Sequence, residues 1–153
     1  MPLKGILVKT SLVDFPGELS CVFFTFGCNL RCPYCYNIPL VQPEDANSEN
    51  YATENELFQH LEKRSKILTG FVLSGGEPLI HGECKELIKK AKLLGYKVKL
   101  DTNGTFPEKL ADLMENPLTM PDYIAMDIKT SPFLYKQHLN PLYPEDIEQK
   151  IKE

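Results

Sequence analysis

The stretch "LSCVFFTFGCNLRCPYCYN", residues 19–37, decides the fold of this chain. Its first part, "LSCVFFTF" (19–26), is an apolar run rich in aromatic and β-branched residues, which is typical of a buried strand. Three cysteines follow the strand directly, Cys28, Cys32 and Cys35, with the spacing C-x3-C-x2-C. In open α/β sheets the carboxyl ends of the strands hold the ligand, so this spacing predicts a metal or redox site at such an end.

The composition favours one globular domain over residues 1–153. Hydrophobic residues make up 42% of the chain and charged residues 25%, and the net charge is -4. A negative chain has no general attraction for nucleic-acid phosphates. No apolar run approaches the ~20 residues of a membrane span, and the first residues lack the layout of a signal peptide. We therefore expect no nucleic acid, no membrane and a cytoplasmic location.

The remaining segments alternate between strand and helix patterns. Further strands are predicted at 70–75, 96–101 and 122–128, and a leading strand with a turn at Pro16–Gly17 is predicted within 4–18. Helices are predicted at 53–66, where Thr53 and Glu56 form a capping box, and at 81–95, 107–116 and 144–153. This order predicts an α/β fold with right-handed crossovers. We expect an incomplete (βα) barrel whose curved, open parallel sheet has about four to five strands.

Side-chain alternation on the last two strands separates an apolar face from a polar one. On the strand at 96–101 the apolar face carries Val98 and Leu100, and on the strand at 122–128 it carries Ile124, Met126 and Ile128. We expect both apolar faces to be turned toward the helices. The opposite face carries small or charged residues, namely Lys97, Lys99, Asp101, Ala125, Asp127 and Lys129. A parallel sheet that is covered on both sides would be apolar on both faces. The polar face therefore predicts a concave site.

Two kinds of metal site compete for the three clustered cysteines. A structural zinc ion needs four closed ligands, usually from two short pairs, but the histidines, His60, His81 and His138, are scattered. A [4Fe–4S] cluster held by three thiolates leaves one iron open to a substrate. The other two cysteines, Cys21 and Cys84, are expected to be plain buried residues.

Together these motifs resemble the radical S-adenosylmethionine (SAM) superfamily. The resemblance rests on C-x3-C-x2-C after the first strand, "SGGEP" at 74–78, "DTNG" at 101–104 and "MDIK" at 126–129. The last two are similar to motifs of the activating enzymes for glycyl-radical proteins. The opening "KTSLVDFPG" at 9–17 is similar to the anaerobic ribonucleoside-triphosphate reductase activating proteins, with the pyruvate formate-lyase activating enzymes as the next family.

The resemblance implies roles for individual residues. Cys28, Cys32 and Cys35 would ligate a [4Fe–4S] cluster, and Tyr34 would lie against the adenine of SAM or merely cover the cluster. Gly75, Gly76 and Glu77 would hold the methionine ammonium group, with Glu77 offering a carboxylate. The cofactor-binding set is completed by Asp101, Thr102, Asn103, Asp127 and Lys129.

Two of these roles have alternatives. A monovalent cation would lie against the SAM carboxylate, held by Asp101, Thr102, the carbonyl of Ala125 and Asp127. The alternative is that the side chains of Asp101 and Asp127 are simply solvated. Lys129 could contact the cosubstrate or the partner, or could be an ordinary exposed lysine.

The implied activity is that of a radical SAM oxidoreductase that activates a glycyl-radical enzyme. A flavodoxin or ferredoxin would donate one electron, SAM would be cleaved to a 5′-deoxyadenosyl radical, and a glycyl radical would form on anaerobic ribonucleotide reductase. The alternatives are a radical SAM enzyme for a small molecule and a shortened, non-catalytic metal-binding module. Similar proteins usually continue with two more strand–helix units of roughly 30 residues each, so we expect these units to be missing from residues 1–153.

Overall fold

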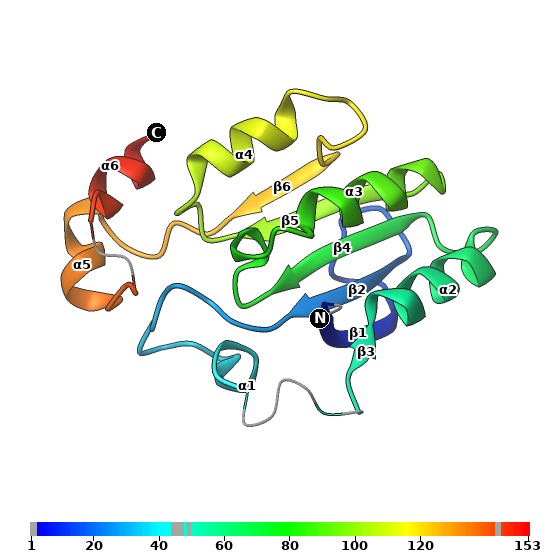
Figure 1. Cartoon of the computed structure of the whole chain (residues 1–153), viewed down its shortest axis with the longest axis horizontal. Coiled ribbons are helices and arrows are strands. Elements are labelled where there is room, and N and C mark those ends of the chain that lie inside the picture. The colour runs from blue at the N-terminus through cyan, green and yellow to red at the C-terminus, as the bar shows by residue number, and fades with distance from the viewer. Residues whose placement is uncertain (1–2, 44–47, 49, 143–144) are drawn as a thin grey trace.

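The computed structural model describes residues 3–43, 48, 50–142 and 145–153. One sheet of six strands runs through the molecule in the order β3-β1-β2-β4-β5-β6 (Figure 1). The strands are β1 (Lys4–Ser11), β2 (Ser20–Thr25), β3 (Ala52–Thr53), β4 (Gly70–Gly75), β5 (Lys97–Thr102) and β6 (Tyr123–Met126). The helices are α1 (Ile38–Val41), α2 (Glu54–Arg64), α3 (Cys84–Leu93), α4 (Pro107–Met114), α5 (Tyr135–His138) and α6 (Ile147–Lys152), with 3-10 turns at Pro78–Ile80 and Pro132–Leu134.

The expected parallel strands are confirmed. β2, β4, β5 and β6 are parallel neighbours, so their carboxyl ends meet at one edge of the sheet. The leading strand β1 runs antiparallel to β2, and β3 adds a sixth strand that was not expected. Because β3 has only two residues, it leaves no alternation in the sequence by which it could be recognised.

The helix signals near α2 and α3 act as predicted. At the start of α2, the backbone N–H of Glu56 donates to the hydroxyl of Thr53, and the N–H of Thr53 donates to the Glu56 carboxylate at 2.8 Å. After α3, Gly95 adopts a left-handed φ of +89°, which suits glycine. The predicted helix start at Pro144 lies outside the described residues, and α6 begins at Ile147.

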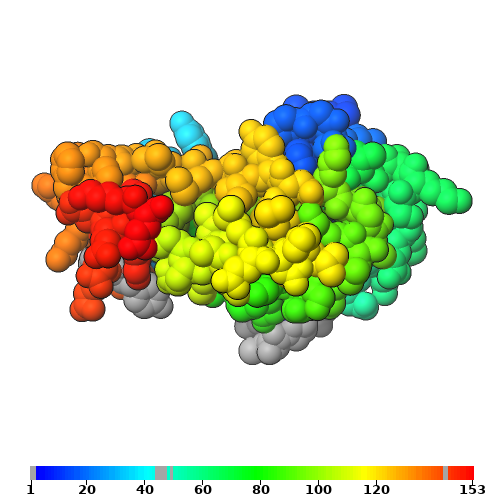
Figure 2. Space-filling model, turned by 90° about the horizontal axis from the view of Figure 1, so that it is seen from above, coloured from blue at the N-terminus to red at the C-terminus, as the bar shows by residue number. Residues whose placement is uncertain are grey.

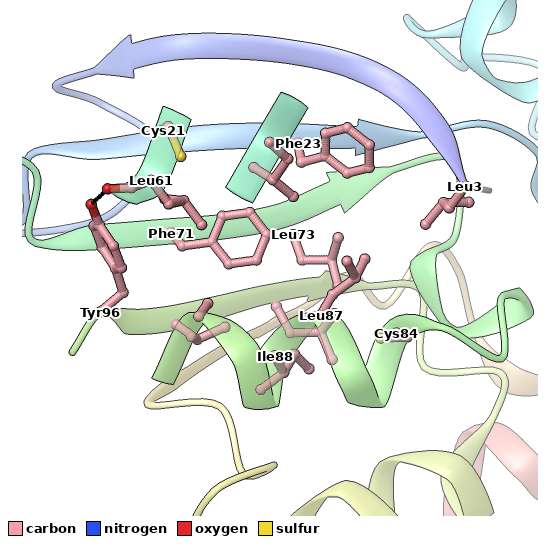
Figure 3. Close-up of a cluster of buried hydrophobic side chains, with 14 of the residues drawn as sticks. Leu3, Cys21, Phe23, Leu61, Phe71, Leu73, Cys84, Leu87, Ile88 and Tyr96 are labelled. Atoms are coloured by element: carbon pink, nitrogen blue, oxygen red, sulfur yellow. Dashed lines mark hydrogen bonds between the residues drawn. The ribbon is translucent and has the colours of Figure 1, made fainter. Parts of the chain in front are cut away.

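The main core lies between the sheet and helices α2 and α3 (Figure 3). Val98 and Leu100 point into it, as the alternation on β5 predicts. Cys21 and Cys84 are buried in the same core, and burial raises the pKa of each thiol to about 12. Their prediction as plain buried cysteines is confirmed.

The concave face of the sheet has a smaller core of its own. The loop after β1 turns at Pro16–Gly17, where the N–H of Glu18 donates to the carbonyl of Phe15 at 3.1 Å. Phe15 thereby packs on Val22 and Val72 at the end of the sheet remote from the cysteines. This leaves the carboxyl ends of β4, β5 and β6 to form a cavity.

The last strand and the last helix differ from expectation. Met126 and Ile128 are 48% and 66% exposed, because β6 is the outermost strand of the described sheet and neither residue joins the helix-side core. Helix α6 does not cover the sheet either: Ile147 packs with Leu30 and Tyr135 beside the cysteine loop. Figure 2 shows this C-terminal segment, in orange and red, gathered at one end of the molecule. None of the helices in the described ranges is long and apolar enough to cross a membrane.

Candidate functional site: a cysteine-lined cavity at the strand ends

The cysteine loop is fixed to the chain on both sides. The N–H of Gly27 donates to the carbonyl of Leu40 at 2.7 Å, which ties the start of the loop to α1. The N–H of Arg31 donates to the carbonyl of Leu139 at 2.8 Å, and the N–H of Leu142 donates to the carbonyl of Asn29 at the same distance. The segment after β6 therefore holds the loop beside the strand ends.

All three clustered cysteines face one cavity of about 540 Å³. Cys28, Cys32 and Cys35 are partly exposed, unlike the two core cysteines. The cavity is also lined by strand-end residues of β4, β5 and β6, including Gly75, Gly76, Lys99, Asp101, Thr102, Asn103, Ala125, Asp127 and Lys129. Sequence alternation had placed the charged groups on one face, and the structure brings them together.

The surroundings of the cysteines suit thiolate ligands of a cluster. The Cys28 sulfur accepts the N–H of Leu30 at 3.4 Å and the side-chain amide of Asn103 at 3.7 Å. Such donors orient and stabilise a coordinating sulfur. Burial raises the pKa of the Cys28 and Cys32 thiols, so a bound metal would be needed to hold them deprotonated. In the described chain no three His, Cys, Asp or Glu side chains are already arranged around a single point for a metal ion.

The two glycines of "SGGEP" are needed for the chain to pack against itself. Gly75 has a φ of +128°, and a Cβ there would lie 2.2 Å from the carbonyl oxygen of Thr25. A Cβ on Gly76 would lie 1.9 Å from the carbonyl oxygen of Gly27. Both glycines line the cavity as expected, and they pack closely against the last residue of β2 and the first residue of the cysteine loop, respectively.

Glu77 lies inside the protein and is held by three hydrogen bonds. Its side chain is fully buried and does not line the cavity. The carboxylate accepts the N–H of Leu79 at 3.0 Å, the N–H of Asn103 at 2.6 Å and the hydroxyl of Thr102 at 2.8 Å. Burial raises the pKa of this carboxyl, which these three donors partly offset. The turn after β4 directs Glu77 inward, where it fastens β4 to β5; its contact with the methionine ammonium stays a prediction.

Asp101 and Asp127 lie on the same cavity, as predicted, but not at matching heights. The cross-strand partner of Asp101 is Ala125, so Asp127 lies two residues farther along the chain from β6. Each carboxylate pairs with a nearby lysine: Asp101 with Lys99, and Asp127 with Lys129 at 2.7 Å. Burial alone would lower the pKa of Lys129, but its pairing with Asp127 outweighs this effect and the pKa is raised. The cation between the two carboxylates stays a prediction.

Tyr34 joins the cysteine loop to the segment after β6. Its hydroxyl donates to the backbone carbonyl of Lys129 at 2.8 Å, and its ring lines the cavity. The N–H of Lys129 donates in turn to the hydroxyl of the fully buried Tyr135 at 2.8 Å. The expected contact of Tyr34 with adenine stays a prediction that its place on the cavity permits.

Two further residues of the site were not predicted. The buried Asn29 links the cysteine loop to the strand end, because its amide donates to Thr105 and its oxygen accepts from Asn103 at 3.0 Å. Lys99 is only 8% exposed and lines the cavity. Alternation had placed Lys99 on the correct face, but a lysine two residues from an aspartate gave no sign that it would be buried.

Comparison with known proteins agrees with this geometry. Residues 22–153 match the model of the radical SAM superfamily. The chain is 35% identical over 147 residues to MJ1227 and 31% identical over 126 residues to MJ1632, both of Methanocaldococcus jannaschii and both named as putative glycyl-radical enzyme activating enzymes. These alignments cover 95% and 82% of this chain, but only 58% and 44% of the relatives.

A relative with a different name and a solved structure are also similar to the chain. A 7-carboxy-7-deazaguanine synthase of Methanopyrus kandleri is 29% identical over 154 residues, which cover 84% of this chain and 58% of that protein. The crystal structure of QueE from Escherichia coli superposes with a TM-score of 0.55 at 17% identity, covering 68% of this chain and 53% of that one. The chain thus spans about half the length of the relatives it matches. The match over residues 22–153 and the cysteine-lined cavity place the chain in the radical SAM superfamily.

Proposed function

We propose that this chain binds a [4Fe–4S] cluster and SAM and generates a glycyl radical on a partner enzyme. Cys28, Cys32 and Cys35 would hold the cluster, and SAM would lie between the cluster and the ends of β4, β5 and β6. The reduced cluster would supply one electron to the sulfonium, giving methionine and a 5′-deoxyadenosyl radical. That radical would take a hydrogen atom from a glycine α-carbon of the partner.

One observation carries this proposal. Three partly exposed cysteines from one loop share a cavity with charged and polar groups from two strand ends. SAM presents an ammonium, a carboxylate and an adenine, so it needs groups of several kinds around one space. Lys99 and Lys129 offer positive charge to its carboxylate, Tyr34 offers a ring to its adenine, and the segment Ser74–Gly76 would meet its ammonium.

The choice of a protein substrate is supported by the named relatives and by the opening "KTSLVDFPG". MJ1227 and MJ1632 carry the name of glycyl-radical enzyme activating enzymes. We propose anaerobic ribonucleotide reductase as the partner and a flavodoxin or ferredoxin as the electron donor.

A small-molecule substrate is the second candidate. It is favoured by the sequence match to a 7-carboxy-7-deazaguanine synthase. A substrate of that kind would have to share the cavity of about 540 Å³ with SAM. The two candidates differ in whether a second protein is needed as the hydrogen donor.

The deciding experiment combines the anaerobically reconstituted, reduced protein with SAM and an anaerobic ribonucleotide reductase. The expected result is the doublet electron paramagnetic resonance (EPR) signal of a glycyl radical on the reductase. It should be absent when either protein or SAM is omitted, and when the reductase glycine is replaced by alanine. SAM cleavage that proceeds without any radical on the reductase, but is stimulated by a deazapurine precursor, would favour the second candidate.

A further inference from the structure

Lys99 lies in the cavity at the place where the expected cation site would need a free carboxylate. Lys99 projects from β5 onto the concave face and is 8% exposed, and its ammonium contacts the carboxylate of Asp101. After β6, the ammonium of Lys129 lies 2.7 Å from the carboxylate of Asp127. Each of the two carboxylates at the strand ends therefore already has a positive partner.

The other expected ligands of a monovalent cation fit poorly as well. The hydroxyl of Thr102 donates to Glu77 at 2.8 Å and accepts the N–H of Gly104 at 3.3 Å, so only one lone pair of its oxygen is left for a cation. Asp101 lies opposite Ala125, while Asp127 is two residues farther along the chain. Asp127 also lies beyond Met126, the last residue of β6, so the two carboxylates start from different heights at the strand ends.

The charge balance of the cavity favours lysine over a bound cation. Two lysines and two aspartates sum to zero before SAM binds, so the strand-end carboxylates themselves need no added cation. Without Lys99 the sum would be negative by one before SAM binds and by two with its carboxylate, which would favour a bound cation. A lysine buried to this extent is costly unless it is paired, and its contact with Asp101 meets that need.

We propose that the ammonium groups of Lys99 and Lys129 take the place of a monovalent cation at the strand ends, so that SAM binding needs neither sodium nor potassium. This inference rests on the proposed function, because it places the carboxylate of SAM in contact with the ammonium groups of Lys99 and Lys129. Lys99 is then a specificity-determining residue: it fixes by covalent attachment a charge that a free ion would supply only by mass action.

The experiment measures the dissociation constant of SAM for the anaerobically reconstituted protein by isothermal titration calorimetry. Three buffers of equal ionic strength contain sodium, potassium or tetramethylammonium chloride, the last being too large to enter a cation site. The wild-type constant is expected to agree within about twofold in all three, since the attached lysines would supply the positive charge whichever ion is present. This comparison needs no variant, so it holds even if a variant fails to fold.

Lys99→Met should create the cation requirement. Its affinity for SAM is expected to fall by about tenfold in tetramethylammonium, the loss of one charge-assisted contact, and to recover in sodium or potassium. Lys99→Arg should keep the wild-type behaviour. Lys97→Met is the matched control, because Lys97 lies on the same strand and face and is also ion-paired, with Glu18, but does not line the cavity.

Three results would overturn the inference. A wild-type affinity that falls about tenfold when tetramethylammonium replaces sodium or potassium would establish the cation site instead. A folded, cluster-bearing Lys99→Met variant that behaves like the wild type in every buffer would remove the role of Lys99. Wild-type protein with an intact cluster that binds no SAM in any buffer would overturn the proposed function, and this inference with it.

Discussion

The hydroxyl of Tyr34 donates a hydrogen bond to the backbone carbonyl of Lys129 at 2.8 Å, across 95 residues of sequence. Tyr34 lies between two of the cluster cysteines, and Lys129 follows the last strand. The bond therefore connects the part of the cavity that would hold the cluster to the part that would hold SAM.

Tyr34→Phe removes only this bond. We expect the free energy of unfolding of the protein without cluster to fall by roughly 0.5–1 kcal/mol, the usual net value of one partly exposed hydrogen bond. Urea unfolding followed by circular dichroism measures the change. Tyr36→Phe is the matched control, since Tyr36 is 98% exposed and only two residues away. An equal loss in both variants would show that the bond contributes nothing specific.

Glu77→Gln tests whether the carboxylate of Glu77 stabilises the fold through its hydrogen bonds or binds SAM. A carboxylate can accept from Leu79, Asn103 and Thr102 together, but a glutamine would turn an NH2 group toward one of these donors. We expect a loss of stability of about 2 kcal/mol, the cost of a buried donor without a partner. Glu83→Gln, at an exposed position beside α3, should change little. Unchanged stability in Glu77→Gln, combined with weaker SAM binding, would support the ligand role instead.

Gly76→Ala should be far more damaging than an ordinary glycine substitution. The new methyl group would lie 1.9 Å from the carbonyl oxygen of Gly27, so the loop that carries the cysteines must move. We expect a loss of several kcal/mol, on the order of 3 or more, together with a failure to retain the cluster. Gly82→Ala is the control, since nothing lies within 4 Å of its added Cβ. Both are measured by thermal unfolding and iron content, and near-equal values would contradict the close approach of Gly76 to the cysteine loop.

The five cysteines should separate into two groups when the metal is removed. In the folded protein without cluster, iodoacetamide is expected to label Cys28, Cys32 and Cys35 and to leave Cys21 and Cys84 unmodified. Burial keeps the last two away from the reagent and raises the pKa of their thiols to about 12. Peptide mass spectrometry with and without urea counts the labels. Early labelling of Cys21 or Cys84 under native conditions would show that the core opens more readily than the burial of these two thiols indicates.

The sequence contained enough information to predict the face of the sheet that forms the site. Alternation along β5 placed Lys99 and Asp101 together, and alternation along β6 and its continuation placed Ala125 with Asp127 and Lys129. The cysteine spacing added the loop that completes the cavity. These signals are local, because each depends on residues a few positions apart on one strand or loop.

The features that were missed depend on contacts between distant segments. Glu77 is buried because a turn brings it against Asn103, 26 residues away. Met126 is exposed because β6 lies at the edge of the sheet. Ile147 packs beside the cysteine loop because the chain leaves the sheet after β6. None of these outcomes follows from local periodicity or capping.

The central claim is that Cys28, Cys32 and Cys35 hold a [4Fe–4S] cluster that cleaves SAM. The most direct measurement is the amount of 5′-deoxyadenosine that the anaerobically reconstituted protein forms from SAM after reduction with dithionite, determined by liquid chromatography and mass spectrometry. The account predicts 5′-deoxyadenosine from the wild type and from Cys84→Ala, and none from Cys28→Ser, Cys32→Ser or Cys35→Ser, each with the 4Fe–4S absorption lost. A wild type that carries four irons yet forms no 5′-deoxyadenosine, or a serine variant that still forms it at the wild-type rate, would contradict the claim.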